Sequence, residues 1–551
     1  MNFKVNESKQ KLSGAYYTPP HIAAFLARWV LESKPKRLLE PSCGDGALIA
    51  ALASAGLSRS AHITACELAP EEASKTVHLA DDLGLRNAQV VRSDFVEWAM
   101  QAIQGGVSFD AAMGNPPFVR YQYIDRGVQD RMEQLFGLLR IPFTRHTNLW
   151  VPFILASLRL LREGGRLAFV VPAELLHVLH AEPLRDYLAK NCREIVVVDP
   201  ADIWFGETLQ GVVLLMAEKR RSADNPFANL EIVSLANRHQ LYTSLESLRN
   251  PANATSTSGL GPKWVGALLT PSERETFRWF STQPCVREFH DLASAEVGIV
   301  TGANKFFFVT DHVVQEFGLR RWSRPMMGRS EHLEGVVYDA EQHERNRQKG
   351  LPTNFLDFDV PFFRRVPEDV SRYVQTGEAE GLHRRYKCRI REPWYVVPSV
   401  YSTPVGLLKR SHHLPKLFLN EAEVLTTDTA YRVRPRGVSS ISLVTSFVNS
   451  LTALSAELEG RHYGGGVLEL VPSEIERLLV PLAEFSNVEL LRLDKSMKNV
   501  GQPVTLLERR DKIIARKLKL DSQAFDVVRG AYNRLRGRRM RLPLPAAEED
   551  Q

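Results

Sequence analysis

Cysteine is scarce in this sequence, and its few copies are scattered. Five cysteines occur among 551 residues, at positions 43, 66, 192, 285 and 388, without a Cys-x-x-Cys pair. A disulfide framework and a zinc site are therefore not indicated, and the composition suits a reducing cytoplasm. Because the amino end, residues 1–9, has no apolar core, no signal peptide is predicted, and no membrane contact is expected.

Metal ligands at useful spacing and internal repeats are also missing. The pair His412-His413 has no partner ligands at metal spacing, so a structural role is favoured and no metal is predicted. With 44% hydrophobic composition, a chain of this length can form at least two domains with cores. The net charge of +6 and the pI of about 8.9 favour a polyanionic partner but are compatible with many others.

A short rigid motif follows the apolar segment that ends at Gly114. It reads Asn115-Pro116-Pro117-Phe118, and its two prolines fix two φ angles and remove two backbone donors. The Asn115 side-chain oxygen and the Asn115 and Pro116 carbonyls can accept hydrogen bonds, while Phe118 supplies a flat apolar surface. Such a site suits a planar amine. For the motif taken alone, a plain turn with a buried phenylalanine is the alternative.

A glycine-containing turn lies upstream, between an apolar strand beginning at Arg37 and a helical pattern beginning at Ala47. Gly44 and Gly46 allow a tight turn and a close approach to a ligand, and the following helix presents its amino end to that ligand. This pattern is typical of a nucleotide pocket. Because a third glycine is absent at the required spacing, NAD is disfavoured.

Two further predicted strands end in carboxylates. The strand from His62 ends at Glu67, about 20 positions after the glycine turn, where ribose hydroxyls are bound in such folds. The next strand, from Ala88, leads to Asp94, for which a helix N-cap is the favoured role if the residue is taken alone. The ordered series of glycine turn, Glu67, Asp94 and the Asn115 motif is harder to explain by caps and surface turns than any one of its members.

This ordered series resembles the motifs of gamma-class N6-adenine-specific DNA methyltransferases of restriction-modification systems, of the type II, Eco57I-like kind. In that class the cofactor motifs precede the catalytic Asn-Pro-Pro-aromatic motif, and a target recognition domain follows. Residues 14–20, Gly-Ala-Tyr-Tyr-Thr-Pro-Pro, resemble the family segment that closes over the methionine end of the cofactor. Residues 148–172, 194–199 and 211–216 are similar to the later helix and strands of the family, so the resemblance spans about residues 14–218.

The resemblance implies S-adenosylmethionine as the cofactor and gives roles to individual positions. Catalysis is implied for Asn115, Pro116, Pro117 and Phe118, although the class commonly has tyrosine at the last of these positions. Stacking on the target base is implied for Phe118 and for Trp204 or Phe205. The implied cofactor-binding residues are Tyr17, Thr18, Pro19, Glu40, Pro41, Ser42, Gly44, Gly46, Glu67, Leu68, Asp94, Phe95 and Asn115.

The resemblance and the alternation of short apolar strands with helical patterns predict the domain organisation. Residues 1–35 are predicted to form an N-terminal helical segment with the cofactor-closing motif. Residues 36–245 are predicted to form the catalytic α/β domain, a Rossmann-like S-adenosylmethionine-dependent methyltransferase fold with a mixed, mostly parallel seven-stranded sheet. The low-complexity residues 250–262 are predicted to be a linker. Residues 263–551 are predicted to form an α+β target recognition domain with C-terminal helices.

Within the predicted recognition domain, residues 297–307, 426–432 and 463–470 resemble signatures of such domains, and a scaffold role is favoured over base reading. Residues 381–391 have no acidic side chain and interleave rings with cations, so DNA contact and a solvated face stay equally open. Residues 506–518 have helical periodicity and a basic face, for which a solvated face over a packed apolar stripe is favoured.

The resemblance implies a site-specific enzyme that methylates the N6 amino group of an adenine flipped out of double-stranded DNA. No nuclease constellation of paired carboxylates with a lysine is found, so cleavage is assigned to a separate cognate restriction endonuclease, and a monomer is expected. Methylation of RNA or of a protein glutamine stays open, because the same acceptors can hold any planar amide or amine. A non-catalytic DNA-binding subunit with a methyltransferase fold is the other alternative.

Overall fold

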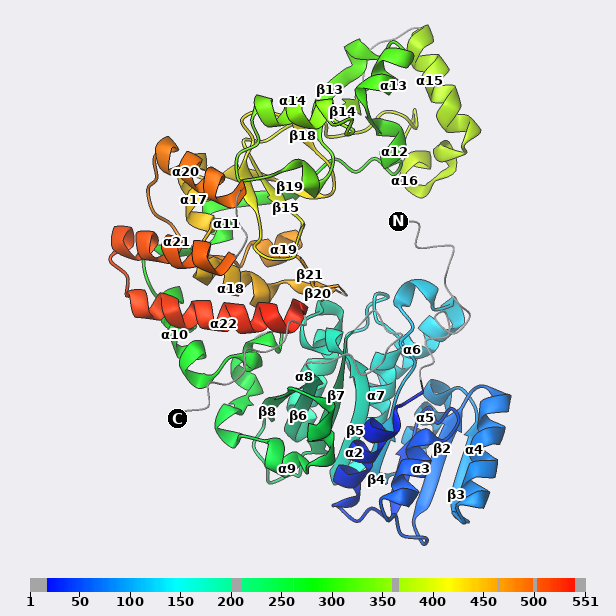
Figure 1. The fold of residues 1–551 in the computed structure, drawn as a ribbon. Coiled ribbons are helices and arrows are strands. Elements are labelled where there is room, and N and C mark those ends of the chain that lie inside the picture. The colour runs from blue at the N-terminus through cyan, green and yellow to red at the C-terminus, as the bar shows by residue number, and fades with distance from the viewer. Residues whose placement is uncertain are drawn as a thin grey trace. The chain divides into compact units, whose positions relative to one another are not determined.

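Two compact units make up the structure, which is a computed structural model (Figure 1). It describes residues 17–200, 211–260, 262–358, 366–463, 465–498 and 503–540. The first unit extends to Pro271, and the second unit covers Ser272–Met540.

The first unit is built around one large sheet. Its strands are rich in buried apolar side chains and follow the order β3-β2-β1-β4-β5-β7-β6-β8-β9. Strands β1 to β5 are parallel neighbours, and β7 lies antiparallel between β5 and β6. The bounds are β1 (Arg37–Glu40), β2 (His62–Glu67), β3 (Ala88–Arg92), β4 (Phe109–Gly114), β5 (Leu161–Pro172), β6 (Cys192–Pro200), β7 (Val212–Lys219), β8 (Asn229–Leu235) and β9 (Thr255–Ser256).

The predicted seven-stranded sheet is present as β1 to β7, but the prediction of seven strands in total is wrong. Strand β8 pairs parallel to β6, and β9 pairs antiparallel to β8. The predicted linker at residues 250–262 therefore contains a strand of the sheet. The first unit ends at Pro271 instead, and the second unit begins at Ser272. The reason is tertiary: β9 is only two residues long, too short to carry a strand pattern, and it forms because Leu230 and Asn229 offer an open edge.

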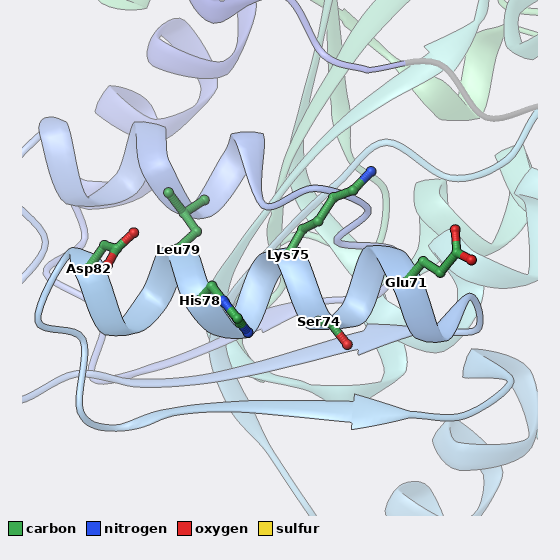
Figure 2. A pocket seen from close by; sticks show the side chains of 6 residues that line it. All are labelled: Glu71, Ser74, Lys75, His78, Leu79 and Asp82. Carbon is green, nitrogen blue, oxygen red and sulfur yellow. The ribbon is translucent and has the colours of Figure 1, made fainter.

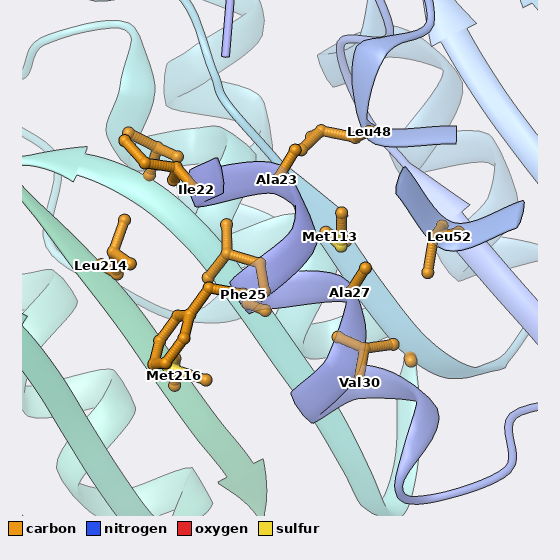
Figure 3. Close-up of a cluster of buried hydrophobic side chains, with 14 of the residues drawn as sticks. Ile22, Ala23, Phe25, Ala27, Val30, Leu48, Leu52, Met113, Leu214 and Met216 are labelled. Atoms are coloured by element: carbon orange, nitrogen blue, oxygen red, sulfur yellow. The ribbon is translucent and has the colours of Figure 1, made fainter. Parts of the chain in front are cut away.

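Helices connect the strands and cover the sheet. The first described helix, α2 (Pro20–Leu31), confirms the expected helix ahead of the first strand. It contacts α3, β4 and β5, and Figure 3 shows its residues Ile22, Phe25 and Val30 in the core with Met113 and Met216 of the sheet. The others are α3 (Ala47–Ser54), α4 (Pro70–Asp82), α5 (Phe95–Gln104), α6 (Arg126–Leu139), α7 (Trp150–Leu160), α8 (Glu182–Asn191) and α9 (Leu245–Leu248).

The second unit has the α+β character that the sequence predicts. Its short strands form four small sheets, in the orders β10-β22, β11-β19-β15-β17, β12-β14-β13-β18 and β16-β21-β20. The strands are β10 (Val286–Glu288), β11 (Ala293–Val297), β12 (Phe308–Val309), β13 (Ser323–Met327), β14 (Asn354–Leu356), β15 (Val405–Leu408), β16 (Arg410–Ser411), β17 (Leu417–Leu419), β18 (Leu425–Thr426), β19 (Ala430–Pro435), β20 (Arg461–Tyr463), β21 (Val467–Glu469) and β22 (Leu479–Pro481).

Helices make up much of the rest of the second unit, and α22 packs on α18 and α21 near the C-terminal end. They are α10 (Pro271–Ser281), α11 (Phe289–Leu292), α12 (Asn304–Phe307), α13 (Asp311–Glu316), α14 (Ala340–Gln348), α15 (Glu368–Ala379), α16 (Tyr386–Arg389), α17 (Ser440–Phe447), α18 (Ser450–Glu459), α19 (Pro472–Ile475), α20 (Asn487–Lys498), α21 (Pro503–Leu518) and α22 (Ser522–Met540). A buried ion pair of 2.7 Å joins Glu457 of α18 to Arg539 of α22. Helix α21 confirms the periodicity predicted for residues 506–518, with Leu507 and Ile514 buried.

Two of the predicted recognition-domain signatures lie against each other. Ile299 forms a bridge with Thr427, and a Cβ added to Gly298 would stand 1.9 Å from the Thr427 carbonyl oxygen. Such a close backbone approach needs glycine. These positions therefore maintain packing, in line with the favoured scaffold role; Gly464 of the third signature lies outside the described residues.

Within the described ranges, no helix taken singly has the length and apolar composition to span a bilayer, while α17 and α18, bent by 77° at their junction, meet that test as a pair.

Candidate active site

Parallel strand order gathers the predicted site residues at one edge of the sheet. Strands β3, β2, β1 and β4 are adjacent and parallel, so their carboxyl ends meet at the same edge. Glu40 ends β1, Glu67 ends β2, Asp94 follows β3 and Asn115 follows β4. Ligands of open α/β sheets bind at this edge.

The glycine turn is held tightly between β1 and α3. Gly44 and Gly46 have φ values of 52° and 85°, which favour glycine, and a Cβ at Gly46 would stand 2.6 Å from the side chain of Leu79. The Thr76 hydroxyl donates to the Gly44 carbonyl at 2.7 Å. Both predicted glycines are thus required by the conformation, and the turn presents backbone rather than side chains.

Glu67 lies beside this turn. Its carboxylate accepts hydrogen bonds from the backbone N–H groups of Gly44 at 3.0 Å and Ala69 at 2.8 Å. A carboxylate has about four acceptor positions, so two bonds leave capacity for ribose hydroxyls. The next residue, Leu68, is 70% exposed and offers an apolar surface at the same place.

Glu40 is a buried carboxylate with an unsatisfied oxygen. Its side chain is only 2% exposed, and its Oε2 has no hydrogen-bond partner among the described residues. Burial, together with the nearby charges of Asp45 and Glu67, raises the pKa of Glu40 well above its usual range. A cationic group bound beside this acceptor would be stabilised by the carboxyl groups of Glu40, Asp45 and Glu67. The ammonium group of S-adenosylmethionine is positively charged and could donate a hydrogen bond to this oxygen.

Asp94 adopts the helix N-cap role that the sequence favours for it when taken alone. Its Oδ1 accepts from the backbone N–H groups of Val96 and Glu97, and its Oδ2 pairs with Arg131 at 3.1 Å. Phe95 is 3% exposed and packs on Phe153 with ring centroids 5.0 Å apart. Its ring is therefore a core side chain in this structure, and cofactor contact by Asp94 and Phe95 stays a prediction. Arg131 had no sequence signal, because it lies 37 positions from its partner.

Asn115 is anchored from two directions. Its side-chain Nδ2 donates to the Thr18 hydroxyl at 3.1 Å, and its backbone carbonyl accepts from the Ser42 hydroxyl at 3.1 Å. Thr18 is buried, and it directly precedes the Pro19 N-cap of α2, whose carbonyl accepts from Ile22 and Ala23. Thr18 and Ser42 thus contact the catalytic-type motif, and cofactor binding by either residue stays a prediction.

The neighbours of Asn115 complete the motif. A Cβ at Gly114 would stand 3.0 Å from the ring of Pro41, so the motif lies directly on the glycine-turn segment. Pro116 is buried, Pro117 is half-buried, and Phe118 is half-buried at the edge of the main core. Tyr17 is 53% exposed, with its hydroxyl 3.4 Å from Glu72.

Two predicted stacking residues, Trp204 and Phe205, lie outside the described residues. The choice between them therefore stays a prediction.

A shallow surface depression lies on α4, lined by side chains of that helix alone. Figure 2 shows these side chains along the helix: Glu71, Ser74, Lys75, His78, Leu79 and Asp82. A hollow formed by one helix surface lacks the converging elements of a ligand site. The strand edge described above remains the candidate active site.

Comparison with known proteins places both units in one family. Residues 59–204 match the family model of the Eco57I restriction-modification methylase, and residues 261–515 match that of the C-terminal domain of type II methyltransferase M.Eco57I. The chain is 22% identical over 508 residues to type II methyltransferase M.AccI of Acinetobacter calcoaceticus, covering 89% of this chain and 90% of that protein. It is 25% identical over 485 residues to M.XamI of Xanthomonas campestris pv. amaranthicola, covering 86% of each.

A solved structure of the type IIG restriction endonuclease BpuSI is similar at 14% identity with a TM-score of 0.40, covering 96% of this chain and 66% of that one. Both family models and both relatives concern one group of proteins, the type II restriction-modification methyltransferases. S-adenosylmethionine is accordingly the methyl donor. The chain belongs to the Eco57I-like type II restriction-modification methyltransferases.

Proposed function

We propose that this protein transfers a methyl group from S-adenosylmethionine to the exocyclic N6 amino group of an adenine flipped out of double-stranded DNA. The observation that carries the proposal is the Asn115-Pro116-Pro117-Phe118 motif, anchored by Thr18 and Ser42 beside the glycine turn. These contacts bring amide and carbonyl acceptors close to the glycine turn, which supports the proposal.

The residues of the motif suit an exocyclic amine. The adenine amino nitrogen is a poor nucleophile because its lone pair is delocalised into the ring. Acceptors at Asn115 and the Pro116 carbonyl would draw its hydrogens out of the ring plane and localise that lone pair. The half-buried ring of Phe118 would stack on the base, which offsets part of the few kcal/mol that unstacking costs.

The remaining site residues would hold and orient the cofactor. Glu67 would accept from ribose hydroxyls, and Glu40 would accept from an ammonium group at its unsatisfied oxygen. When bound, S-adenosylmethionine supplies the electrophilic methyl group. Positioning and electrostatics then account for the acceleration, and no covalent enzyme intermediate is needed.

The cellular setting completes the proposal. We infer that methylation is specific for one DNA sequence and protects host DNA from a separate cognate restriction endonuclease. We further infer that the protein acts in the cytoplasm and is a monomer. The type II relatives and the absence of a nuclease motif from the sequence support the assignment of cleavage to a separate endonuclease. Light scattering coupled to size-exclusion chromatography gives the molar mass in solution and so tests whether the protein is a monomer.

The decisive experiment uses labelled cofactor with duplex DNA, RNA and protein as separate substrates, followed by nucleoside analysis. We expect label in duplex DNA, recovered as N6-methyladenine. Label only in RNA or in glutamine would establish one of the alternatives, and the absence of transfer to every substrate would support a non-catalytic subunit. Label on another base would contradict the adenine assignment.

A further inference from the structure

The second unit presents a run of exposed cations that the active site does not use. We call residues 384–390 the basic segment; its exposed cations are Arg384, Arg385, Lys387 and Arg389. Tyr386 and Ile390, which lie among them, are 64% and 61% exposed. The exposed surface of the basic segment therefore combines an aromatic and a branched apolar side chain with four cations.

These cations have no carboxylate partners among the described residues, unlike two lysines on the other basic surface of the unit. On α21, Lys512 pairs with Glu508 at 2.6 Å, and Lys517 pairs with Glu489 at 3.1 Å. The acidic residues nearest in sequence to the basic segment, Glu380 and Glu392, lie beyond its ends. The charge of the basic segment is therefore available to an outside anion.

The basic segment packs closely against residues 301–302. Cys388 is fully buried and its Sγ lies 3.7 Å from the Thr301 carbonyl. Arg391 donates to the Lys387 carbonyl at 2.7 Å and also to the Thr301 carbonyl. A Cβ at Gly302 would stand 2.6 Å from the Cβ of Lys387, so the backbones approach closely. The segment thus rests on residues 301–302, part of the signature whose backbone also packs on Thr427.

Tyr386 organises two of the cations. Lys387 Nζ lies 5.7 Å and the Arg389 guanidinium carbon 5.6 Å from the centroid of its ring. These cation–π contacts hold the two side chains near one point and reduce the side-chain freedom that binding has to remove.

We propose that the basic segment is a DNA-backbone contact surface, with its cations on phosphates and with Tyr386 and Ile390 against the sugar or base faces. The proposal rests on the proposed function, because it takes double-stranded DNA as the substrate. Four exposed cations in seven residues, without a carboxylate partner among the described residues, fit the closely spaced charges of a nucleic acid strand. Because phosphates carry no sequence information, this surface supports affinity and orientation rather than base choice.

The test measures binding of the full chain to a short duplex of mixed sequence over a salt series. The variant is R385Q/R389Q, and the matched control is R509Q/R516Q, which removes two exposed cations from α21. We expect R385Q/R389Q to reduce the slope of log K against log salt by about 1.8, since each lost phosphate contact removes roughly 0.9. The control should keep the wild-type slope, and R385K/R389K should restore it.

An unchanged slope in R385Q/R389Q, with wild-type thermal stability, would overturn the proposal, as would an equal loss in the control variant. Methyl transfer by the same preparations separates the two proposals. If the wild-type protein methylates duplex DNA while R385Q/R389Q binds with the wild-type slope, only the basic segment assignment fails. If the wild-type protein neither binds nor methylates duplex DNA, the proposed function fails with it.

Discussion

The active site of the first unit and the basic segment of the second unit use polar groups in opposite ways. In the first unit, Asn115 is bonded to Thr18 and Ser42, and Glu67 is bonded to Gly44. In the second unit, Arg385 and Arg389 have no carboxylate partner among the described residues. Internal bonds give the precise geometry that a chemical step needs, whereas unpaired cations give the diffuse attraction that a polyanion needs.

The largest effect should come from separating the two units. We expect a fragment of residues 1–271 to bind S-adenosylmethionine but to lose sequence preference in DNA binding, a loss of roughly 10³-fold or more in affinity for the recognised site. The cut is placed at 271 rather than in residues 250–262, because β9 completes the sheet. A competition gel with specific and scrambled duplexes measures the preference, after cofactor binding has confirmed that the fragment is folded. If the fragment still prefers the specific duplex over the scrambled one, the second unit is not the part that recognises the DNA sequence.

Asn115→Ala should lower kcat by roughly 10² to 10³-fold, the usual cost of removing one preorganised electrostatic contact at the reacting centre. Cofactor affinity should stay close to wild type, because the side chain is proposed to act on the target amine. Single-turnover transfer of labelled methyl groups gives the rate, and calorimetric titration gives the affinity. Near-normal turnover would remove Asn115 from the mechanism.

Glu40 should make cofactor binding depend on pH. Its pKa is raised in the free protein, and a bound ammonium group would lower it, so binding releases a proton. Affinity should therefore rise with pH, by up to about tenfold per pH unit, from the usual carboxyl range up to the raised pKa. Glu40→Gln should abolish this dependence. Calorimetry in two buffers of different ionisation enthalpy counts the protons, and an equal count in wild type and Glu40→Gln would exclude this role.

The same raised pKa has a consequence for stability. Folding disfavours the ionised form of Glu40, so its contribution to folding free energy becomes unfavourable as the pH rises above the usual carboxyl range. Glu40→Gln should then unfold at a higher temperature than wild type at neutral pH without cofactor, which thermal melting measures.

Thr18→Val should have the smallest effect. It keeps the shape of the side chain but removes the acceptor for Asn115 Nδ2, a neutral hydrogen bond contributing about 0.5 to 1.5 kcal/mol. We expect kcat to fall by about 2- to 13-fold, with rescue by Thr18→Ser. Reduced cofactor affinity with unchanged kcat would show that Thr18 serves the cofactor alone.

Most of the first unit could be predicted from sequence because its signals are local. Each of β1 to β4 is a short apolar run that ends beside a polar or glycine-containing turn, so strand and turn are both visible in a few residues. The N-cap geometry of Asp94 is also local, since its bonds reach only Val96 and Glu97. The second unit offered less, because its strands are short and its packing joins distant segments.

The sequence by itself determined the motif order, the catalytic-type Asn115, the glycine turn and the conformations of Gly44 and Gly46, since each depends on neighbouring residues. Only the tertiary structure decided that Thr18 and Ser42 contact Asn115, that β9 extends the sheet, and that the basic segment rests on residues 301–302. These contacts join residues between 25 and 97 positions apart. The path of the folded backbone brings such residues together, and no local pattern in the chain records that path.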